Sequence, residues 1–240
     1  MAHTGNKNFG KKLISPFLDL IFPKTCLGCK KEGSFLCEDC LKCLEVPVGQ
    51  SCVVCNKHAT VSNQLCDSCR HNFNFNTVFV MGTYEGVIKQ IISTLKFDYV
   101  EEVAEKLADM FAQAVDMADL DDKLNGKQLI PVPLHKKRYL ERGFNQAELI
   151  ARHLSTHLNM NFDAKSLQRI KNTKQQANLN RELRFENMKG AFYAQFEKVP
   201  EIVYLFDDVF TTGQTMNEAA KAIKLAGVKE VNVLALAHGN

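Results

Sequence analysis

Apolar residues recur every three to four positions in several stretches of the chain, and short continuous apolar runs separate them. The helical spacing is found over residues 85–97, 101–117, 145–158 and 215–227. The apolar runs, which predict buried strands, occupy residues 76–84, 128–135, 201–206 and 230–239. An acidic turn is expected over 119–127, and the polar, basic stretch 165–190 is expected to be a loop or a mobile arm. Strands and helices therefore alternate from residue 76 onward, which predicts an α/β domain with a mostly parallel sheet flanked by helices.

Cysteine spacing, rather than hydrophobic periodicity, sets the pattern before residue 76. All nine cysteines lie between residues 26 and 69, and eight of them form four CxxC pairs. A CxxC turn can point two thiolates at one tetrahedral ion, so two turns complete a four-cysteine zinc site. Sequential pairing predicts a first site of Cys26, Cys29, Cys37 and Cys40 and a second of Cys52, Cys55, Cys66 and Cys69. Interleaved pairing stays open, and Cys43 is left over.

Structural zinc, as one or two ions, is the favoured explanation of these cysteines. Disulfides require a secreted context, which nothing in the sequence indicates. Redox chemistry is disfavoured because no thioredoxin-like pattern surrounds the CxxC pairs, and an iron–sulfur cluster would use only four of the eight thiols. With four thiolates at each ion no position is open for catalysis, so zinc would serve to fold a segment too short to bury much core.

Three segments are expected along the chain. Residues 1–23 form a lead-in whose apolar run, residues 13–22, predicts an amphipathic helix; a signal peptide is disfavoured because no small-residue cleavage site follows the run. Residues 24–72 form a double zinc-ribbon module, and residues 73–240 form the α/β domain. No segment is long and apolar enough to cross a bilayer.

Charge is unevenly spread along the 240 residues. The chain carries a formal net charge of +3, but residues 127–189 hold 13 Lys/Arg against 5 Asp/Glu. This basic stretch predicts that acidic or phosphate-bearing ligands approach there. The alternative is an ordinary solvated face.

Two adjacent acids, Asp207 and Asp208, follow the strand predicted over 201–206 and precede a hydroxyl-rich loop. Open α/β sheets bind ligands at such strand ends. The N-terminus of the next helix offers free N–H groups for a phosphate, and the two carboxylates can accept hydrogen bonds from vicinal sugar hydroxyls. The residues of the phosphate-binding loop would be Thr211, Thr212, Gly213, Gln214 and Thr215. A ribose 5-phosphate pocket is therefore predicted, with a capped helix after an acidic turn as the alternative; neither GxxxxGK[ST] nor GxGxxG occurs.

Residues 204–215, YLFDDVFTTGQT, resemble the phosphoribosyl pyrophosphate (PRPP) motif of type I phosphoribosyltransferases. Residues 131–151, PVPLHKKRYLERGFNQAELIA, resemble a signature of the ComF/ComFC competence family, which includes GntX-like proteins. Residues 167–192 and the LKF at 95–97 extend that resemblance, which spans 24–239. It implies a type I phosphoribosyltransferase-like sheet preceded by a zinc-ribbon module.

The resemblance also implies roles for individual residues. Asp207 and Asp208 would bind the ribose hydroxyls at the catalytic centre, and the residues from Thr211 to Thr215 would hold the 5-phosphate of Mg²⁺-bound PRPP. Lys96 would lie at the pyrophosphate, unless it is a surface lysine. Candidate contacts to pyrophosphate or another polyanion, with surface ion pairs as the alternative, are Arg138, Arg142, Arg169 and Lys171. Asn145 and Gln146 are possible contacts to an accepting base.

Natural competence is the function that the resemblance implies. Such a protein would work in the cytoplasm, or at the inner face of the membrane through its partners. Its partners would be incoming single-stranded DNA, a ComFA-type helicase and DNA-processing proteins. Two alternatives stay open: an active PRPP-dependent transferase with another acceptor, outside DNA uptake, and a non-catalytic zinc-containing DNA-binding adaptor.

Overall fold

The computed structural model describes residues 25–42, 51–55, 57–58, 65–95, 100–173 and 188–239. Several sequence predictions fall on residues outside these ranges. They concern the lead-in over 1–23, the unpaired Cys43, Lys96, and most of the loop expected over 165–190.

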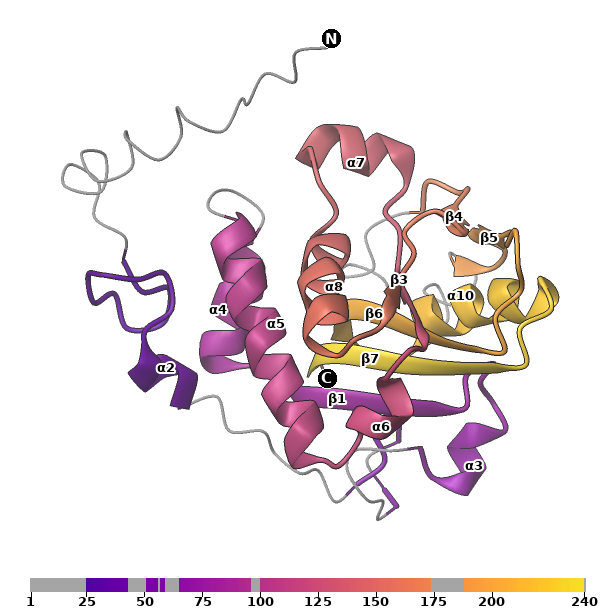
Figure 1. Cartoon of the computed structure of the whole chain (residues 1–240), viewed down its shortest axis with the longest axis horizontal. Helices are drawn as coiled ribbons and strands as arrows, with labels where there is room; N and C mark the ends of the chain where they lie inside the picture. Colours follow the sequence, from indigo (N-terminus) through magenta and orange to yellow (C-terminus); the bar gives the residue numbers. More distant parts are fainter. Residues whose placement is uncertain are drawn as a thin grey trace, which may run out of the picture.

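A five-stranded sheet in the order β1-β7-β6-β2-β3 forms the centre of the molecule (Figure 1). Every pair of neighbouring strands in it is parallel. The strands are β1 (Thr77–Thr83), β2 (Gln128–Pro131), β3 (Asn161–Phe162), β6 (Ile202–Phe210) and β7 (Glu230–His238). The predicted α/β class with a mostly parallel sheet is therefore confirmed.

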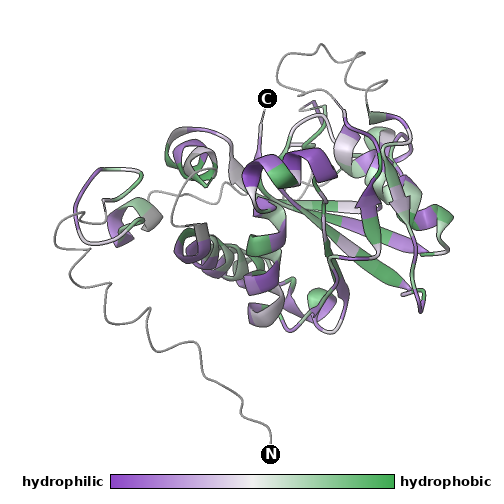
Figure 2. Ribbon diagram, turned by 90° about the horizontal axis from the view of Figure 1, so that it is seen from above, coloured by the Kyte–Doolittle hydropathy of each residue, from purple (hydrophilic) through white to green (hydrophobic). Residues whose placement is uncertain are grey.

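Helices cover both faces of this sheet, which is why its strands read as continuous apolar runs. One layer contains α4 (Gly86–Thr94), α5 (Val100–Met117) and α8 (Gln146–His157), and α10 (Gln214–Leu225) lies on the other face. Figure 2 shows hydrophobic positions along the strands between these layers. In the first layer the ring of Phe111 meets Phe79 and Phe206 edge-on, at centroid distances of 5.5 and 5.8 Å. No helix among the described residues is both long and apolar enough to span a membrane.

The two cysteine clusters attach to different helical layers. Cys26 and Cys40, with the short helix α2 (Glu38–Lys42), join the apolar cluster of α4, α5 and α8. Cys52 and Cys66, with α3 (Asp67–Arg70), join the apolar cluster of α10. Each cluster thus extends one hydrophobic layer of the α/β domain, and the boundary placed at residues 72–73 stays a prediction.

The structure shortens one predicted strand and adds a helix after it. β2 ends at Pro131 rather than at residue 135, since Pro133 cannot donate a ladder hydrogen bond. The chain then forms α7 (Lys136–Arg142), whose first turn is capped by the His135 ring nitrogen, which accepts from the Lys137 N–H at 3.2 Å. Gly143, at φ 80°, ends this helix. A second short helix, α6 (Asp121–Leu124), lies within the turn predicted over 119–127.

A small antiparallel hairpin occupies part of the stretch predicted to be a loop. It pairs β4 (Leu167–Arg169) with β5 (Phe192–Ala194), and its two strands flank the residues that are not described. Three-residue strands show too little alternation to be recognised in sequence, so the prediction of an irregular loop was wrong over Leu167–Arg169, while β5 begins beyond the predicted loop.

Candidate functional site

The acid pair lies inside β6, near its carboxyl end, and not after the strand as predicted. Asp207 pairs in register with Ala235 of β7, and the pairing continues to Phe210 and His238. The strand continues past the two acids because β7 supplies a backbone partner over the whole stretch. In a parallel sheet the carboxyl ends share one edge, so the acids lie beside the ends of β1, β2 and β7.

Asp207 is costly to ionise in this position. Burial raises the pKa of Asp207 well above its ordinary value, and the neighbouring Asp208 raises that pKa further. The backbone N–H of Asp208, which donates to Asp207 Oδ1 at 3.0 Å, and the guanidinium of Arg169 act in the opposite direction. The ionised form of Asp207 is therefore unfavourable at the carboxyl edge of the sheet.

Residues 211–215 lead from β6 into the N-terminus of α10, and we refer to them as the 211–215 loop. Gly213 caps the helix at φ 74°, where a Cβ would lie 2.9 Å from the ring of Phe210. Thr212 Oγ1 and Gln214 Oε1 are buried and make no hydrogen bond among the described residues. Buried polar atoms are nearly always paired, so this loop has capacity for a ligand that hydrogen-bonds to it.

Arg169 of β4 acts on Asp207, and two arginines of α7, Arg138 and Arg142, extend the positive charge from Arg169. Arg138 donates to the Thr173 carbonyl at 2.8 Å, and Arg169 donates to the Thr173 hydroxyl. Thr173, which is only 6% exposed, thus accepts hydrogen bonds from both guanidinium groups. The sequence prediction gave this threonine no role, although it stands in the family-like stretch 167–192, four residues after Arg169.

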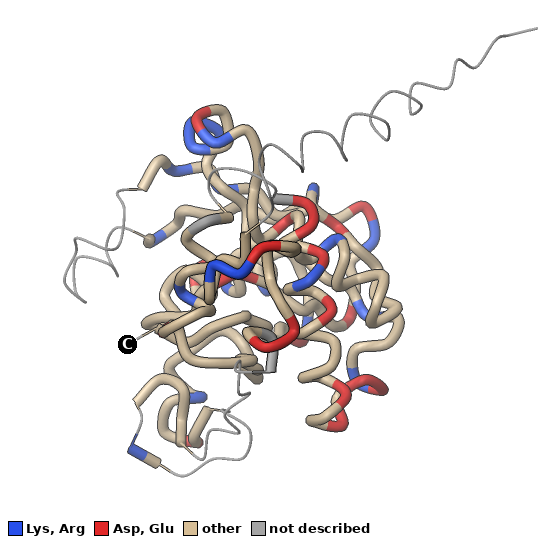
Figure 3. Tube along the Cα trace, turned by 90° about the vertical axis from the view of Figure 1, so that its left-hand side faces the viewer, with Lys and Arg blue, Asp and Glu red and all other residues tan. Residues whose placement is uncertain are grey.

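Positive charge accumulates within this arginine cluster, which we define as Arg138, Arg142 and Arg169. Burial, followed by repulsion from Arg138, lowers the pKa of Arg169 to about 10. Burial, followed by repulsion from Arg142, lowers the pKa of Arg138. The Nε of Arg169 is buried without a partner among the described residues. An anion placed here would reduce the repulsion between the arginines and would accept a hydrogen bond from the unpaired Nε of Arg169. Figure 3 shows the Lys and Arg positions of α7 at the top of the molecule.

Other candidates lie elsewhere or already have partners. Lys171 donates to the Lys189 carbonyl at 2.6 Å, and the Arg142 guanidinium donates to Gln146 at 3.0 Å. The amide nitrogens of Asn145 and Gln146, proposed for an accepting base, donate to the carbonyls of Val132 and Ile92 instead.

His238 lies near the candidate site but was missed in the sequence. It ends β7 at the same edge as the acids, with its ring 6.2 Å from that of Phe210. Burial lowers the pKa of His238, which favours the neutral ring at neutral pH. Its position in the last strand was the only available signal.

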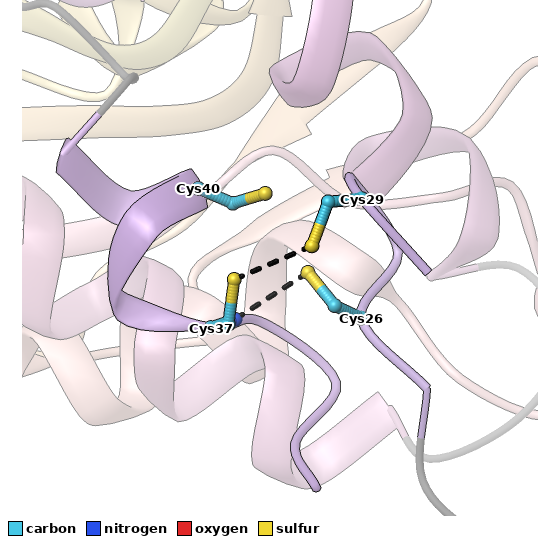
Figure 4. A group of neighbouring side chains, drawn as sticks. All are labelled: Cys26, Cys29, Cys37 and Cys40. Carbon is cyan, nitrogen blue, oxygen red and sulfur yellow. Dashed lines mark hydrogen bonds between the residues drawn. The ribbon is translucent and has the colours of Figure 1, made fainter. Parts of the chain in front are cut away.

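The first cysteine cluster has the form of a tetrahedral metal site (Figure 4). Its four sulfur atoms converge from the loop at 26–29 and from the start of α2. Cys29 Sγ and Cys37 Sγ are 3.5 Å apart, and the Cys37 N–H donates to Cys26 Sγ at 3.4 Å. A zinc ion bound at about 2.3 Å would place its thiolates about 3.8 Å apart. Burial acts to raise the pKa of Cys26, but backbone N–H groups outweigh it and lower that pKa to about 6.

The second cluster repeats this arrangement, with Cys55 Sγ and Cys66 Sγ 3.8 Å apart. In each cluster all four sulfur atoms lie within 4.8 Å of one another, which matches sequential rather than interleaved pairing. A Cβ on Gly28 would lie 2.7 Å from Cys40 Sγ, so the chain leaves room for four thiolates by having no side chain there. The donors and their spacing fit two structural zinc ions.

Comparison with known proteins identifies the family. No protein-family model matches the chain. Competence protein F of Haemophilus influenzae is 31% identical over 224 residues, which cover 88% of this chain and 96% of that protein. The chain belongs to the ComF family. A DNA utilization protein YhgH of Salmonella typhimurium is 32% identical over 64% of this chain and 68% of its own length. Competence protein ComFC of Streptococcus pneumoniae is 26% identical over 86% of this chain and 89% of its own length.

Zinc analysis of this ComF-family chain tests the two cysteine sites. The intact protein is expected to retain about two zinc ions per chain. Gly28→Ala should reduce the content to about one, because the added methyl group displaces Cys40 Sγ from the first site. Lys31→Ala, which removes an exposed ion pair with Asp39 in the same module, should leave the content unchanged. A content below one ion in the intact protein would exclude the zinc-ribbon interpretation.

Asp207→Asn tests the cost of the buried carboxylate. Below the ordinary pKa of 3.8 the side chain is protonated in both the folded and the unfolded state, so the substitution should change little. Above the raised folded-state pKa only the folded state carries the cost, and the melting temperature of the variant should exceed that of the parent by about 2–4 °C, the shift produced by about 1 kcal/mol. The measurement is thermal unfolding against pH. The exposed Asp122→Asn serves as control, and a variant less stable than the parent at pH 8 would contradict the argument.

Proposed function

We propose that this chain binds PRPP, or a related ribose phosphate, at the carboxyl edge of its sheet. The observation that carries the proposal is the sequence of features along β6 and α10: an acid pair at the strand end leads directly into a helix N-terminus whose loop holds unpartnered buried polar atoms. Helix N-termini favour phosphate, and paired carboxylates accept hydrogen bonds from neighbouring hydroxyls.

The ribose end of the ligand would remove the penalty seen at the acid pair. Ribose hydroxyls would donate to Asp207 and Asp208, which stabilises the charged form of Asp207 that burial disfavours. The 5-phosphate would accept from the Thr212 hydroxyl and from the backbone N–H groups at the start of α10. The Gln214 carboxamide can turn to present its amide nitrogen to the same phosphate.

The pyrophosphate end would lie toward the arginine cluster, with Mg²⁺ accompanying the ligand. Arg169 acts electrostatically on Asp207, and Arg138 acts on Arg169, so the three groups form one electrostatic unit. A cluster of cations near the anomeric carbon would also stabilise departing pyrophosphate, which is the requirement for a phosphoribosyl transfer. The Lys96 contact stays a prediction of the resemblance.

The second part of the proposal is a role in DNA uptake. Relatives named for competence and for DNA utilization cover most of this chain, and α7, with the sequence KKRYLER, is a basic helix with no buried residue. Lys136 and Lys137 are exposed on it, and Tyr139 and Leu140 are 44% and 73% exposed. Cations that follow a phosphate backbone, together with an aromatic ring for stacking, suit single-stranded DNA. A ComFA-type helicase and a cytoplasmic location belong to the same proposal.

Calorimetric titration with PRPP and Mg²⁺ tests the ribose phosphate site. The parent is expected to bind, and the double variant Asp207→Asn, Asp208→Asn should lose detectable binding, since amides are weaker acceptors for the ribose hydroxyls. The double variant should keep its affinity for single-stranded DNA, which shows that it is folded. Asp122→Asn is the matched control. A parent that does not bind PRPP would refute this part of the proposal.

Substitution on α7 tests the DNA surface. The triple variant Lys136→Ala, Lys137→Ala, Tyr139→Ala should bind a single-stranded oligonucleotide about tenfold more weakly, and its salt slope should fall by about 1.4, or about 0.7 for each lost phosphate contact. PRPP affinity should not change. Lys106→Ala with Lys198→Ala removes two exposed lysines elsewhere and should have little effect. Equal losses in both variants would indicate general electrostatic attraction rather than a site on α7.

A further inference from the structure

The two cysteine sites differ in what they touch. Around the first site, a Cβ on Gly28 would lie 3.0 Å from the Val87 side chain of α4, and the cluster packs with the α4–α5 layer. The second site belongs to the same apolar cluster as Phe75, Phe210 and Met216, and its Cys55 and Cys69 line a cavity together with Gln214 of the 211–215 loop. Only the second site is therefore next to the candidate phosphate site among the described residues.

A short segment connects the second site to α10. The Asn72 N–H and side-chain amide donate to the carbonyls of Cys69 and Ser68, each at 3.0 Å. Two residues later, Asn74 donates to the Asn217 carboxamide oxygen twice, from its backbone N–H at 2.7 Å and from its side chain at 2.9 Å. Asn217 is only 7% exposed, and its own N–H donates to the Gly213 carbonyl at 2.8 Å.

Phe73 supports the loop between these hydrogen bonds. Its ring lies 3.1 Å from where a Cβ on Gly213 would stand, and its centroid is 4.8 Å from that of Phe75. Phe75 in turn meets Phe210 edge-on at 6.1 Å. The backbone of Gly213 is thus held against two aromatic rings, one of them delivered by the segment that follows Cys69.

A cavity of about 450 Å³ separates the cysteine turns from α10. Cys55, Lys57 and Cys69 line it on one side, and Gln214 and Asn217 on the other. Across this space the second site reaches the first turn of α10 through Phe73, Asn74 and Asn217. The conformation of residues 72–74 depends on the Cys66–Cys69 turn, which an ion would fix.

We propose that the second four-cysteine site positions the 211–215 loop, with Phe73, Asn74 and Asn217 as the positioning residues. The affinity for a 5-phosphate then depends on an ion in the second site and much less on an ion in the first. This inference rests on the proposed PRPP site. It adds that the ligand affinity of that site depends on a bound metal ion, which the arrangement of acids and arginines does not by itself require.

Matched cysteine variants of the full chain test the coupling. Cys66→Ser and Cys37→Ser each remove one thiolate, from the second and the first site respectively, and zinc analysis confirms which ion is lost. Calorimetry with PRPP and with ribose 5-phosphate should show about a tenfold weaker affinity for Cys66→Ser and almost none of this loss for Cys37→Ser. Equal losses in both variants, or parent-like affinity in Cys66→Ser after its ion is lost, would overturn the inference.

A second pair of variants leaves every thiolate in place and decides the matter if Cys66→Ser does not fold. Asn217→Ala removes the acceptor for both Asn74 donors. The affinities for PRPP and for ribose 5-phosphate should fall about tenfold, while zinc content and cooperative unfolding are kept. Asn161→Ala removes a hydrogen bond to Gly126 at the far edge of the sheet and should leave both affinities unchanged. Unchanged affinity in Asn217→Ala would contradict the positioning role.

The parent is titrated first, so a failure of PRPP binding itself is recognised separately and removes the proposed function and this inference together.

Discussion

Parallel pairing of β6 with β7 and β2 brings the carboxyl ends of three strands to one edge of the sheet. Most features of the candidate site follow from that constraint, whereas Arg169 comes from the separate β4–β5 hairpin. The acids lie near the carboxyl end of β6, the 211–215 loop departs from the same edge into α10, and the chain leaving β2 forms α7 with two of the three arginines. Residues from positions 138 to 238 meet there, although the sequence separates them widely.

The site is arranged at an energetic cost that a ligand would reverse. Asp207 is disfavoured as an anion by burial and by Asp208, while burial and repulsion from a neighbouring arginine lower the pKa values of Arg138 and Arg169. Opposite charges are thus concentrated at one edge but incompletely paired. Perturbed groups of this kind gather at functional sites, where the surrounding fold keeps them in place.

Cysteine sites extend both hydrophobic layers of the domain. Each contains too few apolar residues to fold alone, so metal ligation and packing against a helix layer must act together. The second site continues directly into β1 through residues 70–76, which contact α10 on the way. In this arrangement a structural ion acts on a loop that belongs to a different part of the chain.

Much of this organisation was decided by local sequence. Helical spacing placed the buried faces of α5 and α8, apolar runs placed β1, β6 and β7, and the CxxC spacing grouped the cysteines correctly, because each signal is complete within about 20 residues. The acids and the 211–215 loop were recognised for the same reason, although β6 runs past the acids where the sequence predicted its end.

Tertiary structure alone decided the contacts between distant segments. Thr173 joins Arg138 to Arg169, Asn217 receives Asn74, and the β4–β5 hairpin forms across a long separation. The two arginines were candidates from the sequence, but no local pattern marks Thr173 as their partner or pairs Asn74 with Asn217, because a hydrogen bond between distant segments depends on where the sheet places them. The sequence by itself determined which elements form and which chemical groups they carry, and the parallel register of the folded sheet decided which of those groups meet.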